Sequence, residues 1–252
     1  MPGPAPTDST WCNLKSLLGF ALDPTATSRA RPIDSRRGRA SLAWRLREIS
    51  RQVDCPHSQH EIVSCIRAIV DLDDTVPGCL VEAGCYKGGS TAKFSLAAAA
   101  VDRELVVFDS FAGLPAHDEV HGTNIFGKRV TFAEGEYRGS LEEVRRNIDR
   151  LGALPSCRLV PGWFDDTLPS FAEPIAVVYL DVDLASSTRT CLRYLYPRLS
   201  VGGTLFSQDG HLPLVLDVFD DDDFWRAEVG CPKPHVQGFG TSKLLTILKQ
   251  KA

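Results

Sequence analysis

The stretch Val81-Glu82-Ala83-Gly84-Cys85-Tyr86-Lys87-Gly88-Gly89-Ser90 decides the fold. It follows a short apolar run, residues 79–81, and precedes residues 91–100, which are rich in helix-forming side chains. The pattern predicts a buried strand, a glycine turn and a helix. Glycines are typical where a backbone takes a positive φ or comes close to a ligand. Since open α/β sheets bind their ligands at the carboxyl ends of strands, we expect a ligand site at this turn.

Glu82 is the residue of this turn that discriminates between classes of ligand. A pyrophosphate is anionic and binds at backbone N–H groups and helix N-termini, so a carboxylate beside it is unfavourable. A cationic ligand that carries an amino group or a sulfonium is favoured instead. From this stretch alone, an ordinary strand-to-helix turn without a ligand remains an alternative.

Length and composition restrict the class of protein. The 252 residues fit one domain, and the 43% hydrophobic content is typical of a globular protein with a proper core. A net charge of −4 and the lack of a long basic run argue against nucleic-acid binding, and no apolar run is long enough for a membrane span. The N-terminus does not resemble a secretory signal. The eight cysteines lack CxxC spacing, so we expect reduced thiols in a cytoplasmic protein and no zinc site.

The chain order predicts an N-terminal part and a single catalytic domain. Residues 1–40 are expected to be mostly flexible, apart from a possible helix over 11–22. Residues 41–252 form the domain, in which 41–76 hold two helices, 41–53 and 58–72. The core, 77–252, alternates strands and helices. Strands are expected over residues 79–85, 104–110, 157–160, 175–183, 204–208 and 243–249, and helices over 88–101, 140–151, 186–199 and 213–227.

This alternation predicts a Rossmann-like, doubly wound, mostly parallel α/β sheet. Residues 111–137 interrupt it with several glycines and no period, which is typical of an active-site lid. Carboxylates follow the ends of successive strands: Glu82, Asp109, Asp165, Asp166, Asp181, Asp183 and Asp209. Each one alone is also common as a helix N-cap. Gathered on one edge of a parallel sheet, they suit a ligand with hydroxyl and amino donors, or a divalent cation.

Five motifs occur in the order of the expected strands: Glu82-x-Gly84-x-x-x-Gly88-Gly89, Phe108-Asp109-Ser110-Phe111-x-Gly113-Leu114-Pro115, Gly162-Trp163-Phe164-x-Asp166-Thr167-Leu168-Pro169, Leu180-Asp181-x-Asp183-Leu184 and Leu195-Tyr196-Pro197-x-Leu199-x-x-Gly202-Gly203. Together they resemble the macrocin and mycinamicin O-methyltransferase family, whose members use S-adenosylmethionine (SAM) to methylate sugar hydroxyls of antibiotics. The resemblance covers residues 76–210, over half the chain.

The resemblance implies a SAM site. Its residues are Glu82, Gly84, Ser90, Asp109, Ser110, Gly162, Trp163, Phe164, Asp165 and Asp181. Those that follow the first strand would surround the methionine part of SAM. Asp109 would accept both ribose hydroxyls, which a carboxylate can do bidentately. Residues 162–165 would hold the adenine ring.

The resemblance also implies a catalytic magnesium ion held by Asp181 and Asp209, to which we expect Gln208 to add a weaker oxygen ligand, with Asp183 close enough to take the proton of the substrate. This chain departs from the family pattern at one point. The family usually has two adjacent acids after the fifth strand, whereas Gln208 supplies a neutral amide, which coordinates a hard cation with less charge compensation. The metal is therefore in question, and His211 becomes a rival general base.

The sequence thus predicts a SAM-dependent O-methyltransferase, assisted by Mg²⁺, that acts on a hydroxyl of a sugar or another small natural product and associates as a possible homo-oligomer. Three alternatives remain open. The first is a metal-independent methyltransferase with Asp183 or His211 as base, and His117 and His121 on the lid are further candidates. The second is a NAD-type oxidoreductase on a similar fold, which would need a G-x-G-x-x-G turn. The third is a cofactor-binding protein without catalysis, for which Gln208 is the indication.

Overall fold

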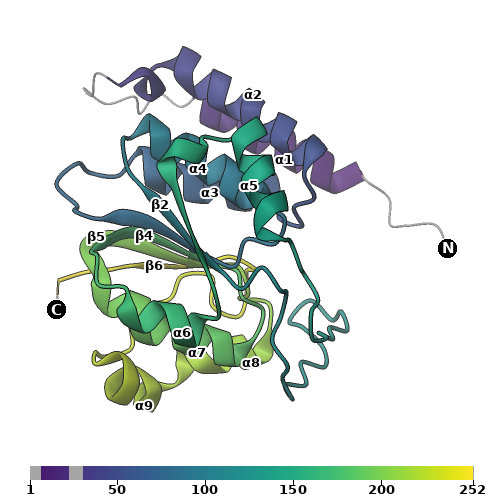
Figure 1. Ribbon diagram of the computed structural model, residues 1–252, viewed down its shortest axis with the longest axis vertical. Helices are drawn as coiled ribbons and strands as arrows, with labels where there is room; N and C mark the ends of the chain where they lie inside the picture. The colour runs from purple at the N-terminus through teal and green to yellow at the C-terminus, as the bar shows by residue number, and fades with distance from the viewer. Residues whose placement is uncertain (1–6, 23–30, 252) are drawn as a thin grey trace.

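A computed structural model describes residues 7–22 and 31–251. Its centre is a six-stranded sheet between two layers of helices (Figure 1). The strand order is β3-β2-β1-β4-β5-β6, in which β6 alone runs antiparallel. The strands are β1 (Cys79–Ala83), β2 (Leu105–Asp109), β3 (Cys157–Pro161), β4 (Ile175–Leu180), β5 (Leu199–Ser207) and β6 (Leu245–Leu248). The predicted doubly wound, mostly parallel α/β sheet is therefore confirmed.

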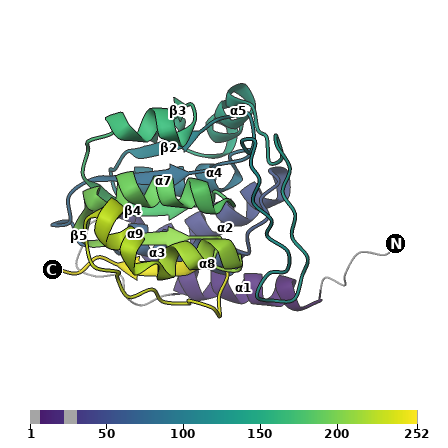
Figure 2. The ribbon, with the colours of Figure 1, turned by 90° about the horizontal axis from the view of Figure 1, so that it is seen from below.

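Helices cover both faces of the sheet, and each layer encloses its own apolar core (Figures 1 and 2). One face carries α1 (Thr7–Leu22), α2 (Arg36–Gln52), α3 (Gln59–Val70), α4 (Gly89–Ala100) and α5 (Leu141–Leu151). The other carries α6 (Phe164–Thr167), α7 (Ala185–Leu195), α8 (Pro213–Asp220) and α9 (Asp222–Phe224). Because β1 pairs with both β2 and β4, the chain order reverses beside β1, where sheets of this class bind ligands.

The N-terminal part differs from the expectation of a mostly flexible segment. Helix α1 packs against α2 and α3, and its Phe20 is fully buried beneath the guanidinium groups of Arg39 and Arg67. Helix α2 begins at Arg36, five residues earlier than expected, because the Ser35 side chain caps its first turn. The possible helix over 11–22 is thus confirmed, whereas the expected boundary at residue 40 is wrong. Residues 1–6 and 23–30 lie outside the described chain.

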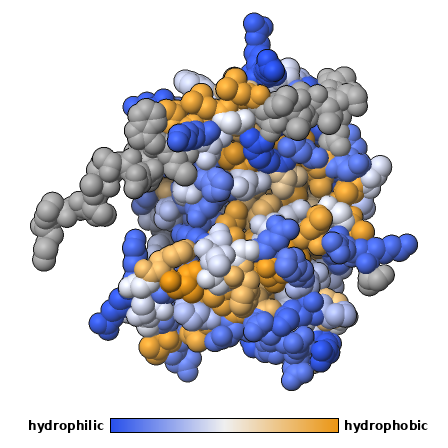
Figure 3. All heavy atoms as spheres, turned by 180° about the vertical axis from the view of Figure 1, so that it is seen from behind, coloured by the Kyte–Doolittle hydropathy of each residue, from blue (hydrophilic) through white to orange (hydrophobic). Residues whose placement is uncertain are grey.

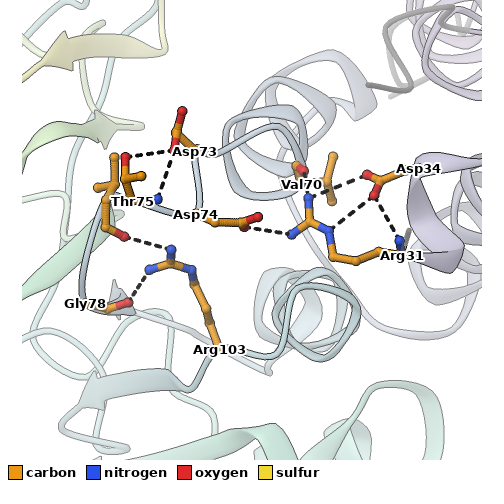
Figure 4. A network of polar contacts seen from close by, with 9 residues as sticks. Arg31, Asp34, Val70, Asp73, Asp74, Thr75, Gly78 and Arg103 are labelled. Atoms are coloured by element: carbon orange, nitrogen blue, oxygen red, sulfur yellow. Dashed lines mark hydrogen bonds and ion pairs between the residues drawn. The ribbon is translucent and has the colours of Figure 1, made fainter. Parts of the chain in front are cut away.

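Two arginines hold the N-terminal layer to the start of the sheet (Figure 4). Arg31 pairs with Asp34 and donates to the carbonyl oxygen of Val70 at the end of α3. Arg103 donates to the carbonyl oxygens of Val76 and Gly78, immediately before β1, at 2.7 and 2.6 Å. Hydrogen bonds to charged groups are about twice as strong as neutral ones. The hydrogen bonds of Arg31 and Arg103 therefore fix the connection between α3 and β1, and with it the direction from which α3 approaches the sheet.

Several element boundaries also differ from the sequence prediction. Strand β4 ends at Leu180 rather than Asp183, because the chain bends there and Asp183 takes a positive φ of 59°. Strand β5 begins five residues early, at Leu199. The single helix expected over 213–227 is divided, because Asp221 is extended and its side chain caps the next turn at Phe224. A π-helical turn, Trp225–Val229, then follows.

Residues 111–137 form a long irregular segment at one end of the sheet (Figure 2). We call this segment the lid. The backbone N–H of Ile125 donates to the carbonyl oxygen of His211 at 3.0 Å. The Glu119 carboxylate accepts from the N–H groups of Ala185 and Ser186, at the start of α7. The lid is therefore attached to the core on both sides of its tip.

The face opposite to that of Figure 1 mixes apolar and charged side chains in separate groups (Figure 3). Leu14, Leu18 and Leu22 of α1 are partly exposed at four-residue spacing, which places them on one side of the helix. The association of this chain into a homo-oligomer stays a prediction.

Within residues 7–22 and 31–251, no helix combines the length and the apolar character needed to cross a bilayer.

Candidate active site

A cavity of about 380 Å³ opens at the carboxyl ends of the strands, with the lid as one of its walls. Ten of the predicted site residues line it: Gly84, Asp109, Ser110, Gly162, Trp163, Phe164, Asp181, Asp183, Asp209 and His211. Four others lie outside its lining: Glu82, Ser90, Asp165 and Gln208. The sheet therefore brings most of the acidic edge together around one cavity, as the order of parallel strands predicts.

Gly84 occupies a position that only glycine fits. Its φ is 82°, and an added Cβ atom would lie 1.9 Å from the carbonyl oxygen of Asp181. That close approach joins the ends of β1 and β4, where the Asp181 N–H donates to the carbonyl oxygen of Ala83. Gly88 likewise takes a positive φ and begins α4. The predicted strand–glycine turn–helix is confirmed, and the turn forms the floor of the cavity.

Asp109 at the end of β2 holds this turn in place. Its Oδ2 accepts from the N–H of Cys85 and its Oδ1 from the N–H of Phe111, both at 2.7 Å. Burial raises the pKa of its carboxyl above the usual value, while these hydrogen bonds oppose the shift. Each carboxylate oxygen has a second lone pair. Asp109 therefore acts as a local cap and at the same time lines the cavity.

Glu82 lies beneath the cavity floor, on the side of the sheet that faces α4. Its side chain is fully buried, and its Oε1 accepts from the Ser90 hydroxyl at 2.5 Å. Burial raises the Glu82 pKa to about 8, so the carboxyl is mostly protonated at neutral pH. Strand alternation explains this placement, because Val81 and Ala83 pack into the opposite core. The two residues contact each other and do not reach the cavity in this structure.

The segment after β3 supplies an aromatic wall. Trp163 is 41% exposed and lines the cavity together with Phe164. Gly162 takes a φ of 142°, which turns the chain into the short helix α6. Asp165 is directed elsewhere, because its Oδ1 accepts from the Thr190 hydroxyl of α7 at 2.9 Å. The wall can therefore pack against a flat ring, whereas Asp165 joins α6 to α7.

His57, which the sequence reasoning missed, lies against the acidic end of β4. Its Nε2 atom is 2.7 Å from Oδ2 of Asp181, and its side chain is only 3% exposed. Burial alone would raise the pKa of Asp181, but the charge and hydrogen bond of His57 hold it below the usual value. His57 precedes Ser58, the N-cap of α3, and no motif surrounds it. Only the packing of α3 on the sheet brings it to the cavity.

Asp183 and Asp209 line the same cavity as Asp181. Oδ2 of Asp209 accepts from the N–H groups of Val182 and Asp183, at 2.9 and 3.1 Å. Burial and the charge of Asp181 raise the pKa of Asp209 to about 7. Burial raises the pKa of Asp183 well above its usual value, and the neighbouring Asp209 and Asp181 add to the shift. Asp183 also holds a positive φ, a strain that clusters at functional sites.

A divalent metal does not fit the donors at this edge. Gln208 is fully buried outside the cavity lining, and its Oε1 accepts from the Tyr179 hydroxyl at 3.2 Å. One oxygen of Asp181 is engaged by His57, and one of Asp209 by two backbone N–H groups. In the described part of the chain, no three His, Cys, Asp or Glu side chains gather as metal ligands. The magnesium site predicted at Asp181, Gln208 and Asp209 is not supported.

Besides His57 and Arg129, two further basic side chains line the cavity, His211 and Lys243. Lys243, a second residue that the sequence reasoning missed, lines it just before β6. Burial and the charge of Lys243 lower the pKa of His211 to about 4, so its imidazole is neutral at physiological pH. His121 on the lid packs against Phe132 and pairs with Glu119. It and His117 lie outside the cavity lining.

Comparisons with known proteins agree with the resemblance. The profile of the macrocin-O-methyltransferase (TylF) family matches residues 57–228. A tetracenomycin-type relative, the 8-demethyl-8-(2,3-dimethoxy-alpha-L-rhamnosyl)-tetracenomycin-C 4'-O-methyltransferase of Streptomyces olivaceus, is 35% identical over 182 residues, 70% of this chain and 68% of the relative. Mycinamicin III 3''-O-methyltransferase of Micromonospora griseorubida is 36% identical over 162 residues, 62% of this chain and 61% of its own.

Solved structures show the same fold. The structure of the O-methyltransferase NovP superimposes with a TM-score of 0.59 and 25% identity, covering 97% of this chain and 100% of its own. That of CalS11, a calicheamicin methyltransferase, gives a TM-score of 0.54 and 18% identity over 98% of this chain and 94% of its own. At 18% identity, the similarity to CalS11 is evidence for the fold alone.

Proposed function

The chain belongs to the macrocin O-methyltransferase family, and from that premise we propose that it methylates a sugar hydroxyl of a natural product, with SAM as the methyl donor. Membership makes the chain an O-methyltransferase, and the resemblance read from the sequence is confirmed. One relative is named as the 4'-O-methyltransferase of a rhamnosyl-tetracenomycin and another as the 3''-O-methyltransferase of mycinamicin III, and the first name supports a glycoside as acceptor. The observation that carries the proposal is one cavity with Asp109 and Trp163 on one side and Asp183 on the other.

The first side suits the adenosine part of SAM. The free lone pairs of Asp109 can accept the ribose hydroxyls, and the exposed face of Trp163 can pack on adenine. Gly84 and Gly162, which have no side chain, allow the ligand to approach the backbone. When bound, SAM supplies an electrophilic methyl on a positively charged sulfur. The acidic end of the sheet favours that charge.

Asp183 is the residue that takes the proton of the acceptor. The hydroxyl oxygen forms a bond to the methyl carbon, the bond from methyl to sulfur breaks, and the hydroxyl proton passes to the carboxylate of Asp183. A general base is more effective when its pKa lies near the working pH. Burial and the neighbouring acids raise the pKa of Asp183 toward that range, whereas His211, with a pKa of about 4, is a weak base. The cationic cofactor and Lys243 favour the ionised carboxylate that the reaction needs.

No step of this proposal passes through magnesium, because the oxygen of Gln208 and one oxygen each of Asp181 and Asp209 are engaged elsewhere. The rival oxidoreductase function is not favoured by any described feature, since the glycine turn lacks G-x-G-x-x-G spacing.

Calorimetry and a turnover assay test the proposal. The chain should bind SAM or its demethylated product S-adenosylhomocysteine (SAH), and NAD should give no measurable heat. Radiolabelled SAM incubated with a panel of rhamnosides and other deoxysugar glycosides should then transfer label to at least one acceptor. Preference for NAD would refute the cofactor assignment. SAH binding without transfer to any glycoside would refute the acceptor class and favour the binding protein without catalysis.

A further inference from the structure

The ends of β4 and β5 carry three polar side chains on one face, and His57 from the loop before α3 joins them. Tyr179 pairs in register with Phe206, so two residues further along Asp181 lies beside Gln208. The Tyr179 hydroxyl donates to Gln208, and His57 reaches Asp181 at 2.7 Å. The His57 ring also contacts the Tyr179 ring edge to face, with centroids 6.2 Å apart. We call His57, Tyr179, Asp181 and Gln208 the β4–β5 polar group.

In the β4–β5 polar group, the Nε2 atom of His57 occupies the position beside Asp181 Oδ2 at which a metal ion would bind. His57 donates from Nε2 to the Asp181 carboxylate when Nε2 carries a proton, that is, in the neutral Nε2–H tautomer and in the imidazolium form. Gln208 brings no negative charge, and its oxygen is already paired. Hard divalent cations are held by several oxygen ligands, and their affinity depends strongly on the number of charged ligands. The β4–β5 polar group provides only one carboxylate, that of Asp181, and one of its two oxygens is already engaged by His57.

Lys243 adds a positive charge to the same cavity. The N–H of Gly210 donates to its carbonyl oxygen at 2.9 Å, which ties Lys243 to the end of β5 directly after Asp209. Its side chain lines the same cavity as Asp181, Asp183 and Asp209. Three carboxylates in one place repel one another unless a cation or a proton lies among them. A lysine there meets that requirement and repels a second cation.

We infer that His57 and Lys243 take the place of a divalent cation at this site, so that the chain performs methyl transfer without a bound metal. The inference rests on the proposed function, because it concerns how the same cavity compensates the charge of its acids. His57 fixes the orientation of Asp181 and engages one of its oxygens. Lys243 balances the negative charge of the acids that line the cavity.

Metal binding can be measured without an acceptor. The full chain, treated with EDTA and dialysed, is titrated with Mn²⁺, and free Mn²⁺ is followed by electron paramagnetic resonance. Wild type and the matched control Gln52→Asp, which adds an acid on the exposed side of α2, should bind Mn²⁺ equally weakly. Gln208→Asp should bind at least about tenfold more tightly, because it adds a charged ligand beside Asp181. Lys243→Met in that background should tighten binding about tenfold more, whereas the control Lys128→Met should not.

A second pair of variants tests His57. His57→Ala should increase Mn²⁺ affinity by several-fold, because it frees an oxygen of Asp181, whereas His57→Gln, which keeps a donor, should not. Loss of the packing of His57 alone would not produce this difference in Mn²⁺ affinity between His57→Ala and His57→Gln. If Gln208→Asp does not fold, as judged by its circular dichroism, Lys243→Met in the wild-type background replaces it and should also gain Mn²⁺ affinity.

Three outcomes of the Mn²⁺ titrations overturn the inference: tight binding of one Mn²⁺ per wild-type chain, unchanged affinity in Lys243→Met, or equal gains in His57→Ala and His57→Gln. Calorimetry of wild type with SAH, in EDTA and in Mg²⁺, should give affinities within about twofold of each other. Failure to bind SAH would refute the proposed function, whereas SAH binding that requires Mg²⁺ would refute only the inference.

Discussion

The Nε2 atom of His57 lies 2.7 Å from Oδ2 of Asp181, a residue 124 positions further along the chain. The contact joins the loop before α3 to the end of a central strand. Helix α3 is in turn fixed by α1 and by the arginines around its C-terminus. The N-terminal helices therefore determine the geometry of the acidic end of the cavity, although they contribute few residues to its lining.

Asp109→Ala should weaken SAH binding by about 2–3 kcal/mol, the cost of leaving hydrogen bonds to a charged group unmade. Asp109→Asn, which keeps one acceptor oxygen for the turn, should lose less. The exposed Asp166→Ala serves as the control and should bind SAH as wild type does. Calorimetry measures all three. Unchanged affinity in Asp109→Ala would show that this side chain acts only as a cap.

Asp183→Asn should reduce methyl transfer about 10²–10⁴-fold while SAH binding is retained, because it removes the proton acceptor. In wild type the rate should rise with pH as Asp183 loses its proton, since the folded protein holds that pKa well above its usual value. The slow residual activity of Asp183→Asn should lack this rise. Rates are measured with radiolabelled SAM and whichever glycoside is accepted. A normal rate in Asp183→Asn together with an inactive His211→Ala would transfer the role to His211.

Gly84→Ala should destabilise the fold by more than about 3 kcal/mol, because strain at a positive φ adds to a clash with the Asp181 carbonyl. Gly127→Ala is the matched control. Its φ of 77° is nearly the same, but an added Cβ atom would meet nothing within 4 Å. It should cost only about 1–2 kcal/mol. Urea denaturation monitored by circular dichroism measures both, and equal losses would show that backbone strain alone makes Gly84 necessary.

The lid should be cleaved by a protease within residues 111–137 in the free chain and protected by SAH, because active-site loops close over their ligands. Glu119→Gln should accelerate cleavage of the free chain, since a neutral amide is a weaker acceptor for the α7 N–H groups. Glu134→Gln, also on the lid but exposed and away from α7, is the control. Mass spectrometry of the fragments locates the cuts. Equal rates with and without SAH would indicate a static loop.

The sequence predicted those parts of the site that depend on local pattern. Apolar runs such as residues 175–180 identify buried strands, and the glycines at 84 and 88 identify the turn, because their backbone conformations are unfavourable for other residues. Parallel strand order then placed the acids on one edge. The length of residues 111–137 indicated a loop that covers the cavity.

The rest depends on long-range packing that no local pattern encodes. His57 and Lys243 reach the cavity because α3 and β6 dock beside β4 and β5. Glu82 was expected beside the cofactor, but strand alternation directs it toward Ser90 and α4. The carboxyl of Asp165 satisfies a hydroxyl on α7 instead of facing the cavity. In each case the partner, and therefore the direction of the side chain, comes from a distant part of the chain.

The attachment of Glu119 to the start of α7 couples the opening of the lid to the loss of hydrogen bonds in the first turn of that helix. The N-cap residue of α7 is Leu184, which has no side-chain acceptor, so the first turn obtains its acceptor from the lid. Each opening of the lid consequently exposes the N–H groups of Ala185 and Ser186 to water. Their rate of exchange with deuterium therefore reports how often the cavity opens, and it does so without any ligand being present.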